Sequence, residues 1–132
     1  MPPPGPTLAT DDELLAFVGD IVGEPLRHQF WFLTLDSVDR VFGVVIHMDL
    51  PPVIPTAAES AHFGGNLCDS IRLAGAASLV VVLERGGGRA LSRHDRAWLG
   101  ACVDASIDHR FRLRGPILVS DQGARWIGME DL

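Results

Sequence analysis

Residues 78–83, with the sequence Ser-Leu-Val-Val-Val-Leu, form a run in which apolar and polar side chains do not alternate. A strand with one face in water alternates, whereas an uninterrupted apolar run is typical of a strand that is buried on both faces. Other layers of structure must therefore cover both sides of its sheet. We expect this run to be the central strand of a sheet with helices on either side.

The residues before this run predict a helix, a hairpin and a second helix. Thr10 and Glu13 form a capping-box pattern, which opens a helix that ends near Gly23. Segments 29–36 and 41–49 are rich in aromatic and β-branched residues and predict an antiparallel hairpin. The second helix is predicted from apolar residues that recur at four-residue steps: Phe63, Leu67 and Ile71.

The residues after the run predict a third helix and two short strands. Ser92 and Asp95 have capping spacing, and the inner face of their helix is predicted to carry Trp98, Cys102 and Ala105. Segments 116–120 and 125–128 are predicted to be the strands. Residues 10–132 thus form a single α/β domain with a mixed β-sheet flanked by helices, in the order α-β-β-α-β-α-β-β.

Composition restricts the partners and the cellular location. Residues 1–9 are rich in proline and lack the features of a secretory signal, so we expect a disordered tail and a cytoplasmic protein. No apolar run approaches the roughly 18 residues of a membrane span, and the net charge of −6 argues against a nucleic-acid partner. Two cysteines are too few for a disulfide framework, so Cys68 and Cys102 are predicted to be buried thiols.

Several segments are similar to a known family. An early strand over 28–36 ends in Leu-Asp, a buried strand covers 79–84, Ser92 and Asp95 have Ser-x-x-Asp spacing, and the last strands fall within 111–121. In this order they resemble the JAB/MPN (JAMM) metalloprotease-like domain of bacterial RadC-type proteins, which has a cytidine-deaminase-like fold. The resemblance covers most of residues 26–128 and rests on order and spacing more than on identity.

The sequence departs from the family pattern at its functional positions. Val82 and Glu84 stand where the resemblance implies two zinc-ligating histidines, and His28 stands where it implies the acid–base glutamate. Catalytic zinc needs three protein ligands and an open position for water, and valine offers no ligand atom. The resemblance therefore implies the scaffold without the isopeptidase activity. We expect a non-catalytic protein-interaction or scaffold module without a cofactor, with a second copy of the chain as one candidate partner.

An altered metal site is the first alternative. His28, Glu84 and Asp95 occupy functional positions of the pattern and could hold zinc or manganese in a hydrolase, with Ser92 as a further catalytic candidate. This reading requires the three ligand side chains to converge. Ser92 and Asp95 are also explained as a capping pair alone.

A small-anion site is the second alternative. Gly86, Gly87 and Gly88 precede a helix, and their amides could hold an anion with help from Arg89 and Arg93. A plain turn is the simpler interpretation of the glycines. The remaining histidines lack metal-ligand spacing and are interpreted as structural or surface residues: His47, His62, His94 and His109.

Overall fold

The computed structural model of the chain describes residues 5–88 and 90–132. The elements are α1 (Asp11–Val22), β1 (Gln29–Leu35), β2 (Val41–Asp49), α2 (Ala57–Ala74), β3 (Ser78–Glu84), α3 (Arg93–Asp108), β4 (Arg112–Ser120), β5 (Gly123–Trp126) and a short 3-10 helix, η1 (Met129–Asp131). Helices flank a mixed sheet, as the sequence predicts, and the main elements follow in the predicted order.

The five strands form one sheet in the order β2-β1-β3-β4-β5. β3 runs antiparallel to β1 and parallel to β4, while the β1–β2 and β4–β5 pairs are antiparallel. All seven residues of β3 are buried. The prediction that this apolar run is the central strand is confirmed.

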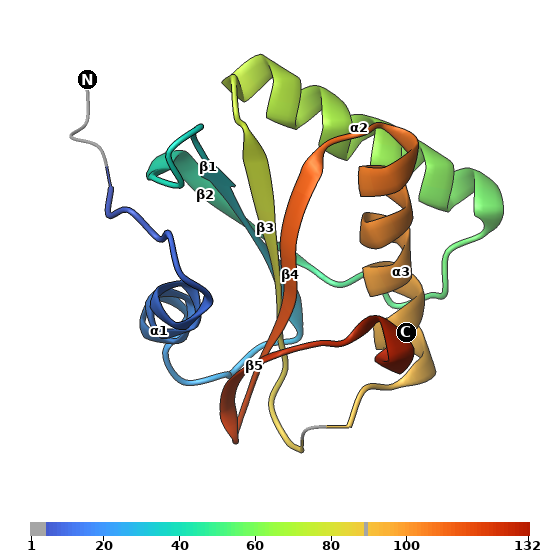
Figure 1. Cartoon of the computed structure of the whole chain (residues 1–132). Helices are drawn as coiled ribbons and strands as arrows, with labels where there is room; N and C mark the ends of the chain where they lie inside the picture. The colour runs from blue at the N-terminus through green and yellow to red at the C-terminus, as the bar shows by residue number, and fades with distance from the viewer. Residues whose placement is uncertain (1–4, 89) are drawn as a thin grey trace.

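Helices cover both faces of the sheet (Figure 1). α1 lies on one face, where Leu14 and Val18 pack against Val80 and Val82 of β3. α2 and α3 lie on the other face, together with the other apolar side chains of the same strand, which are Leu79, Val81 and Leu83. Because strand side chains alternate, even-numbered residues of β3 point to α1 and odd-numbered residues point to α2 and α3.

Capping boxes begin α1, α2 and α3. In α1 the Thr10 hydroxyl accepts a hydrogen bond from the Glu13 amide and the Glu13 carboxylate accepts one from the Thr10 amide, as predicted. Thr56 with Glu59 does the same for α2, which begins six residues before Phe63. Each box satisfies amide groups that a helix start otherwise leaves unpaired.

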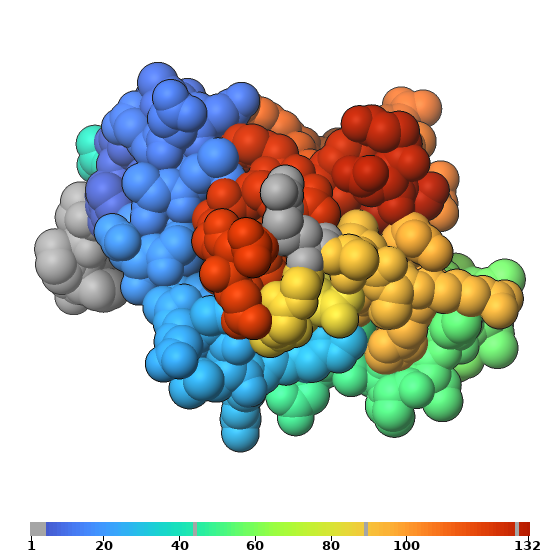
Figure 2. All heavy atoms as spheres, turned by 90° about the horizontal axis from the view of Figure 1, so that it is seen from below, coloured from blue at the N-terminus to red at the C-terminus, as the bar shows by residue number. Residues whose placement is uncertain are grey.

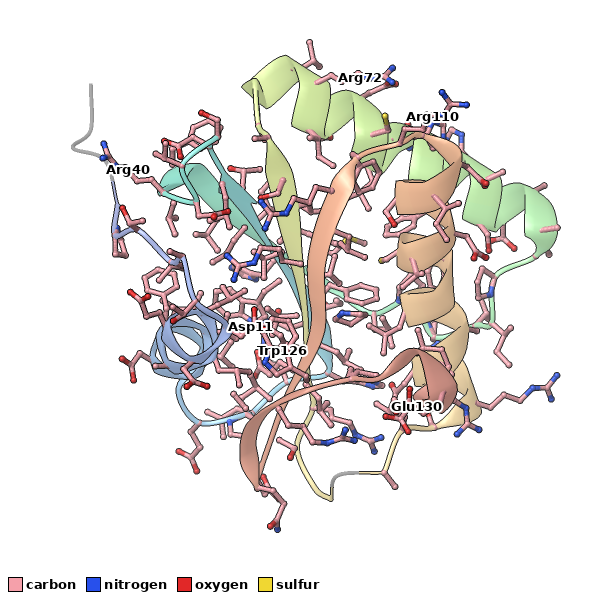
Figure 3. All side chains as sticks on the ribbon, viewed as in Figure 1. Asp11, Arg40, Arg72, Arg110, Trp126 and Glu130 are labelled. Atoms are coloured by element: carbon pink, nitrogen blue, oxygen red, sulfur yellow. The ribbon has the colours of Figure 1, made fainter. Side chains whose placement is uncertain are left out.

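Part of the predicted tail belongs to the folded domain. The Gly5 amide donates to the Val41 carbonyl over 2.9 Å, and the Leu8 amide donates to the Asp39 carbonyl over 2.7 Å. Arg114 Nη1 holds the Leu8 carbonyl at 2.5 Å, and its Nη2 reaches Asp11, which lies at the start of α1 on the side that faces the sheet (Figure 3). The tail prediction is therefore wrong for residues 5–8; residues 1–4 lie outside the described residues.

The C-terminal strands differ in extent from the prediction. β4 begins at Arg112 instead of residue 116, because Ser78 to Val80 of β3 pair with its first three residues. The charge of Arg114 within this strand is accommodated by its hydrogen bond to the Leu8 carbonyl and by the carboxylates of Asp11 and Asp39. β5 ends at Trp126, two residues before the predicted end.

Two further expectations concern the thiols and the membrane. Cys68 and Cys102 are both free and buried, as predicted. Within residues 5–88 and 90–132, no helix has the length and apolar character that crossing a membrane requires.

Candidate functional site

The candidate residues gather where β3 ends and α3 begins. Figure 2 views the molecule from this end, and the yellow loop after β3 lies there between the light-blue segment before β1 and the orange-red β4–β5 turn. Asp95 is in the first turn of α3, and His28 immediately precedes β1. The segments that carry the predicted site are therefore neighbours in space.

Asp95 is the centre of this site. Its side chain is fully buried, and its Oδ1 accepts a hydrogen bond from His28 Nε2 over 2.5 Å. Its Oδ2 accepts one from Arg85 Nη1 over 2.7 Å and one from the Ser92 amide over 2.9 Å. The structure thus brings His28 and Asp95 together, as the metal hypothesis required, and adds Arg85, which sequence reasoning did not select.

The environment of Asp95 favours its ionised form. Burial by itself would raise the pKa of this carboxyl group, because water solvates the charged form best. The hydrogen bonds from Ser92 and His28, together with the charges of Arg85 and His28, outweigh burial and hold the pKa below its ordinary value. Asp95 is therefore a stable anion at neutral pH.

His94 is the member of this cluster that sequence reasoning assigned to structure or surface. The ligand atoms of His28, His94 and Asp95 all lie within 4.8 Å of one another. The Nε2 of His94 is hydrogen-bonded to the Pro51 carbonyl, and the two imidazole rings lie 6.0 Å apart, almost perpendicular. Histidine spacing could not reveal this residue; its position next to Asp95 was the only available signal.

Glu84 makes a separate set of contacts. Its Oε1 accepts hydrogen bonds from Gln29 Nε2 over 2.7 Å and from Trp31 Nε1 over 2.8 Å. Its Oε2 accepts one from the Arg27 amide over 2.9 Å. Burial would raise the pKa of Glu84, but these hydrogen bonds and one from the Leu26 backbone hold it below the ordinary value.

The predicted metal site of His28, Glu84 and Asp95 is not assembled. Glu84 shares its sheet face with Trp31 and with Val82, on the side of α1, whereas Asp95 belongs to α3 on the opposite side. The physical reason is strand alternation, which sends residues 82 and 84 to the same face. The positions that the resemblance equates with ligand histidines therefore point away from Asp95, and the donor set does not fit a JAB/MPN-type zinc site.

The glycine loop is already engaged by the protein's own groups. The Gly87 amide donates to Asp121 Oδ2 over 2.9 Å, so a carboxylate of the β4–β5 turn takes the place that an anion would need. Gly86 lies close to the Pro25 carbonyl, which an added Cβ would approach to 3.1 Å. Of the other residues of the predicted anion site, Gly88 and Arg93 are exposed and Arg89 lies outside the described residues.

Ser92 acts as a helix cap. Its hydroxyl oxygen accepts a hydrogen bond from the Asp95 amide over 3.0 Å, and the Asp95 side chain accepts one from the Ser92 amide. This is the reciprocal capping box that the spacing predicts. The Ser92 hydroxyl is therefore engaged at the start of α3, and the Asp95 amide that donates to it is not available to a bound anion.

Comparison with protein-family models and with curated proteins finds no match for the chain. A buried carboxylate that is paired with the Arg85 guanidinium and hydrogen-bonded to the His28 ring is an ion-pair cluster. It ties the segment before β1, the end of β3 and the start of α3 to one another.

Proposed function

We propose that this chain is a non-catalytic JAB/MPN-like domain that serves as a protein-interaction or scaffold module. The resemblance of its segments to that family supports the proposed scaffold, and the ion pair around Asp95 supports the proposed absence of metal chemistry. A scaffold does not by itself carry an activity, which resides in the residues of its site. Binding without metal chemistry is therefore the role that we propose for it.

The observation that carries the proposal is the ion pair between Arg85 and Asp95. The resemblance places a ligand carboxylate at Asp95, and here a guanidinium nitrogen lies 2.7 Å from it. Arginine does not lose its proton in proteins, so this positive charge is permanent. A divalent ion at the same carboxylate would be repelled by the guanidinium or would have to displace it.

The partner class follows from charge and from the site. The chain carries a net charge of −6, which disfavours polyanionic partners such as nucleic acid. A cluster that joins three segments of the chain supports a rigid binding domain. We therefore propose a protein partner.

The metal content of the purified, tag-free chain tests this proposal. The protein is incubated with zinc or manganese, desalted and analysed by elemental mass spectrometry. We expect far less than one metal ion per chain.

Near-stoichiometric metal would contradict the proposal if it disappears in the variants His94→Ala and Asp95→Asn and persists in the control His62→Ala, which changes an exposed histidine of α2. That result would favour a metal centre formed by His28, His94 and Asp95, whose ligand atoms are close enough to share an ion. Such a centre differs from the predicted one, because His94 replaces Glu84.

A further inference from the structure

β2 is an edge strand whose outer side is largely uncovered by the described residues. It lies at the end of the sheet, next to β1. On its outer side, residues 5–8 pair with the segment around Arg40 and Val41 only. Arg40 marks this end of the strand in Figure 3. The rest of the edge offers main-chain groups to a further strand.

The direction of these main-chain groups follows from the pairing with β1. The Leu50 amide donates to the His28 carbonyl, so Leu50 faces β1. Phe30 lies opposite Met48, and Phe32 lies opposite Ile46. Since successive residues of a strand direct their N–H and C=O groups to opposite sides, residues 47 and 49 direct theirs outward. Residues 45–49 therefore form a regular stretch of edge, beyond the irregular pairing near Gly43, and none of residues 5–88 and 90–132 pairs with its outer side.

This edge has few of the features that normally block strand addition. Residues 41–48 contain no aspartate, glutamate, lysine or arginine. Natural sheets usually protect a long edge with charged residues, proline or bulges. Here the irregularity at Gly43 protects only the first part of the strand. The remaining part exposes Ile46, which keeps 53% of its surface accessible.

An apolar cavity of about 640 Å³ lies beside the same edge, between β2 and α2. The sheet contributes Phe42, Ile46 and Met48, and α2 contributes Phe63 and Leu67. A strand added to β2 would direct every second side chain toward this cavity. Main-chain pairing and a pocket for alternate side chains are the two elements by which sheet edges recognise extended segments.

We propose that the occupant is a second copy of this chain, bound by antiparallel pairing of residues 45–49 of β2 with the same residues of its partner. The inference rests on the proposed function, because it names the partner of the interaction module. β2 supplies both requirements, an open edge and an extended strand that such an edge accepts, in which Asp49 at the end of the paired stretch is the one carboxylate and lies opposite the partner's Val45. Around a two-fold axis both edges are satisfied at once, and no like charges are placed opposite each other within residues 45–48.

The test is the oligomeric state of the full chain, measured by sedimentation velocity across low to high micromolar concentrations. We expect a reversible dimer. Ile46→Asp introduces a charge beside the edge and should weaken dimerisation about tenfold or more. His47→Pro removes an outward N–H and the side-chain hydrogen bond between His47 Nδ1 and Gln29 Oε1 while sparing the main-chain hydrogen bonds to β1, and should also give monomers. Far-ultraviolet circular dichroism verifies that each variant is folded.

The matched control is Ile107→Asp, which adds the same charge at another exposed isoleucine, on α3, where 64% of the surface is accessible. This variant should remain dimeric. A wild-type chain that stays monomeric at every concentration overturns the inference, as does a dimer that both β2 variants leave unchanged. Either result leaves the metal content unaffected, so failure of this inference can be told apart from failure of the proposed function.

Discussion

Arg85 donates a hydrogen bond from Nη1 to Asp95 Oδ2 over 2.7 Å, which places a fixed positive charge against a fully buried carboxylate. The pair connects the end of β3 to the first turn of α3. His28 contacts the other oxygen of the same carboxylate and connects the segment before β1. In this arrangement Asp95 joins three segments of the fold. A carboxylate whose two oxygens both accept hydrogen bonds from the protein has a structural role.

The first prediction concerns acid stability. The folded state lowers the pKa of Asp95, so its contribution to stability is present above the ordinary carboxyl value of about 4 and is lost as the pH falls through the lower folded value. We expect the free energy of unfolding to decline below about pH 4, and to decline less steeply in Asp95→Asn. Urea unfolding at a series of pH values measures this slope. An unchanged slope in Asp95→Asn, or an equal effect of Asp12→Asn on exposed α1 surface, would contradict the assignment.

The second prediction concerns Glu84. Its carboxylate accepts hydrogen bonds from Gln29, Trp31 and the Arg27 amide, so Glu84→Gln replaces an acceptor with a donor that faces other donors. We expect a loss of about 1–3 kcal/mol in the free energy of unfolding, measured with urea. The control Glu24→Gln changes an exposed residue and should have almost no effect. Equal stability of the two variants would show that the contacts of Glu84 are not structural.

The third prediction compares two adjacent glycines of α2. An added Cβ at Gly64 would meet the Cβ of Ala105 in α3 at 2.9 Å, whereas one at Gly65 would meet nothing within 4 Å. Alanine is favoured over glycine within a helix, so Gly65→Ala should raise the unfolding free energy by about 0.5–1 kcal/mol. Gly64→Ala should lower it by about 1–3 kcal/mol, because α2 and α3 must separate. Thermal unfolding of the two variants should therefore shift in opposite directions. A shift in the same direction would contradict the close approach of these helices.

The fold was predictable where the signals are local. Thr10 with Glu13 and Ser92 with Asp95 give capping boxes within four residues of sequence, and both boxes form. The start of α2 could have been found in the same way, since Thr56 and Glu59 have the same pattern. The start of β4 could not, because Arg114 is tolerated there through long-range contacts with Leu8, Asp11 and Asp39.

The candidate site was predictable only in part. His28 and Asp95 were selected together through the spacing of the resemblance, and they do meet. The separation of Glu84 from His28 and Asp95 could have been inferred. Glu84 follows Val82 by two residues in a strand buried on both faces, so the two side chains point to the same face of the sheet. The position of the His94 ring beside His28 and Asp95 could not be inferred, because the ring is held by the carbonyl of Pro51, a residue far from it in the sequence.

The central claim is that Asp95 is held in a structural ion pair with Arg85. A double-mutant cycle with Arg85→Leu, Asp95→Asn and the combined variant, followed by urea unfolding, measures the coupling free energy between the two side chains most directly. We expect each single variant to lose about 2 kcal/mol, and the combined variant to lose less than their sum by about 1 kcal/mol or more. Additive losses, with a coupling free energy close to zero, would contradict the claim and would leave the carboxylate of Asp95 free for another role.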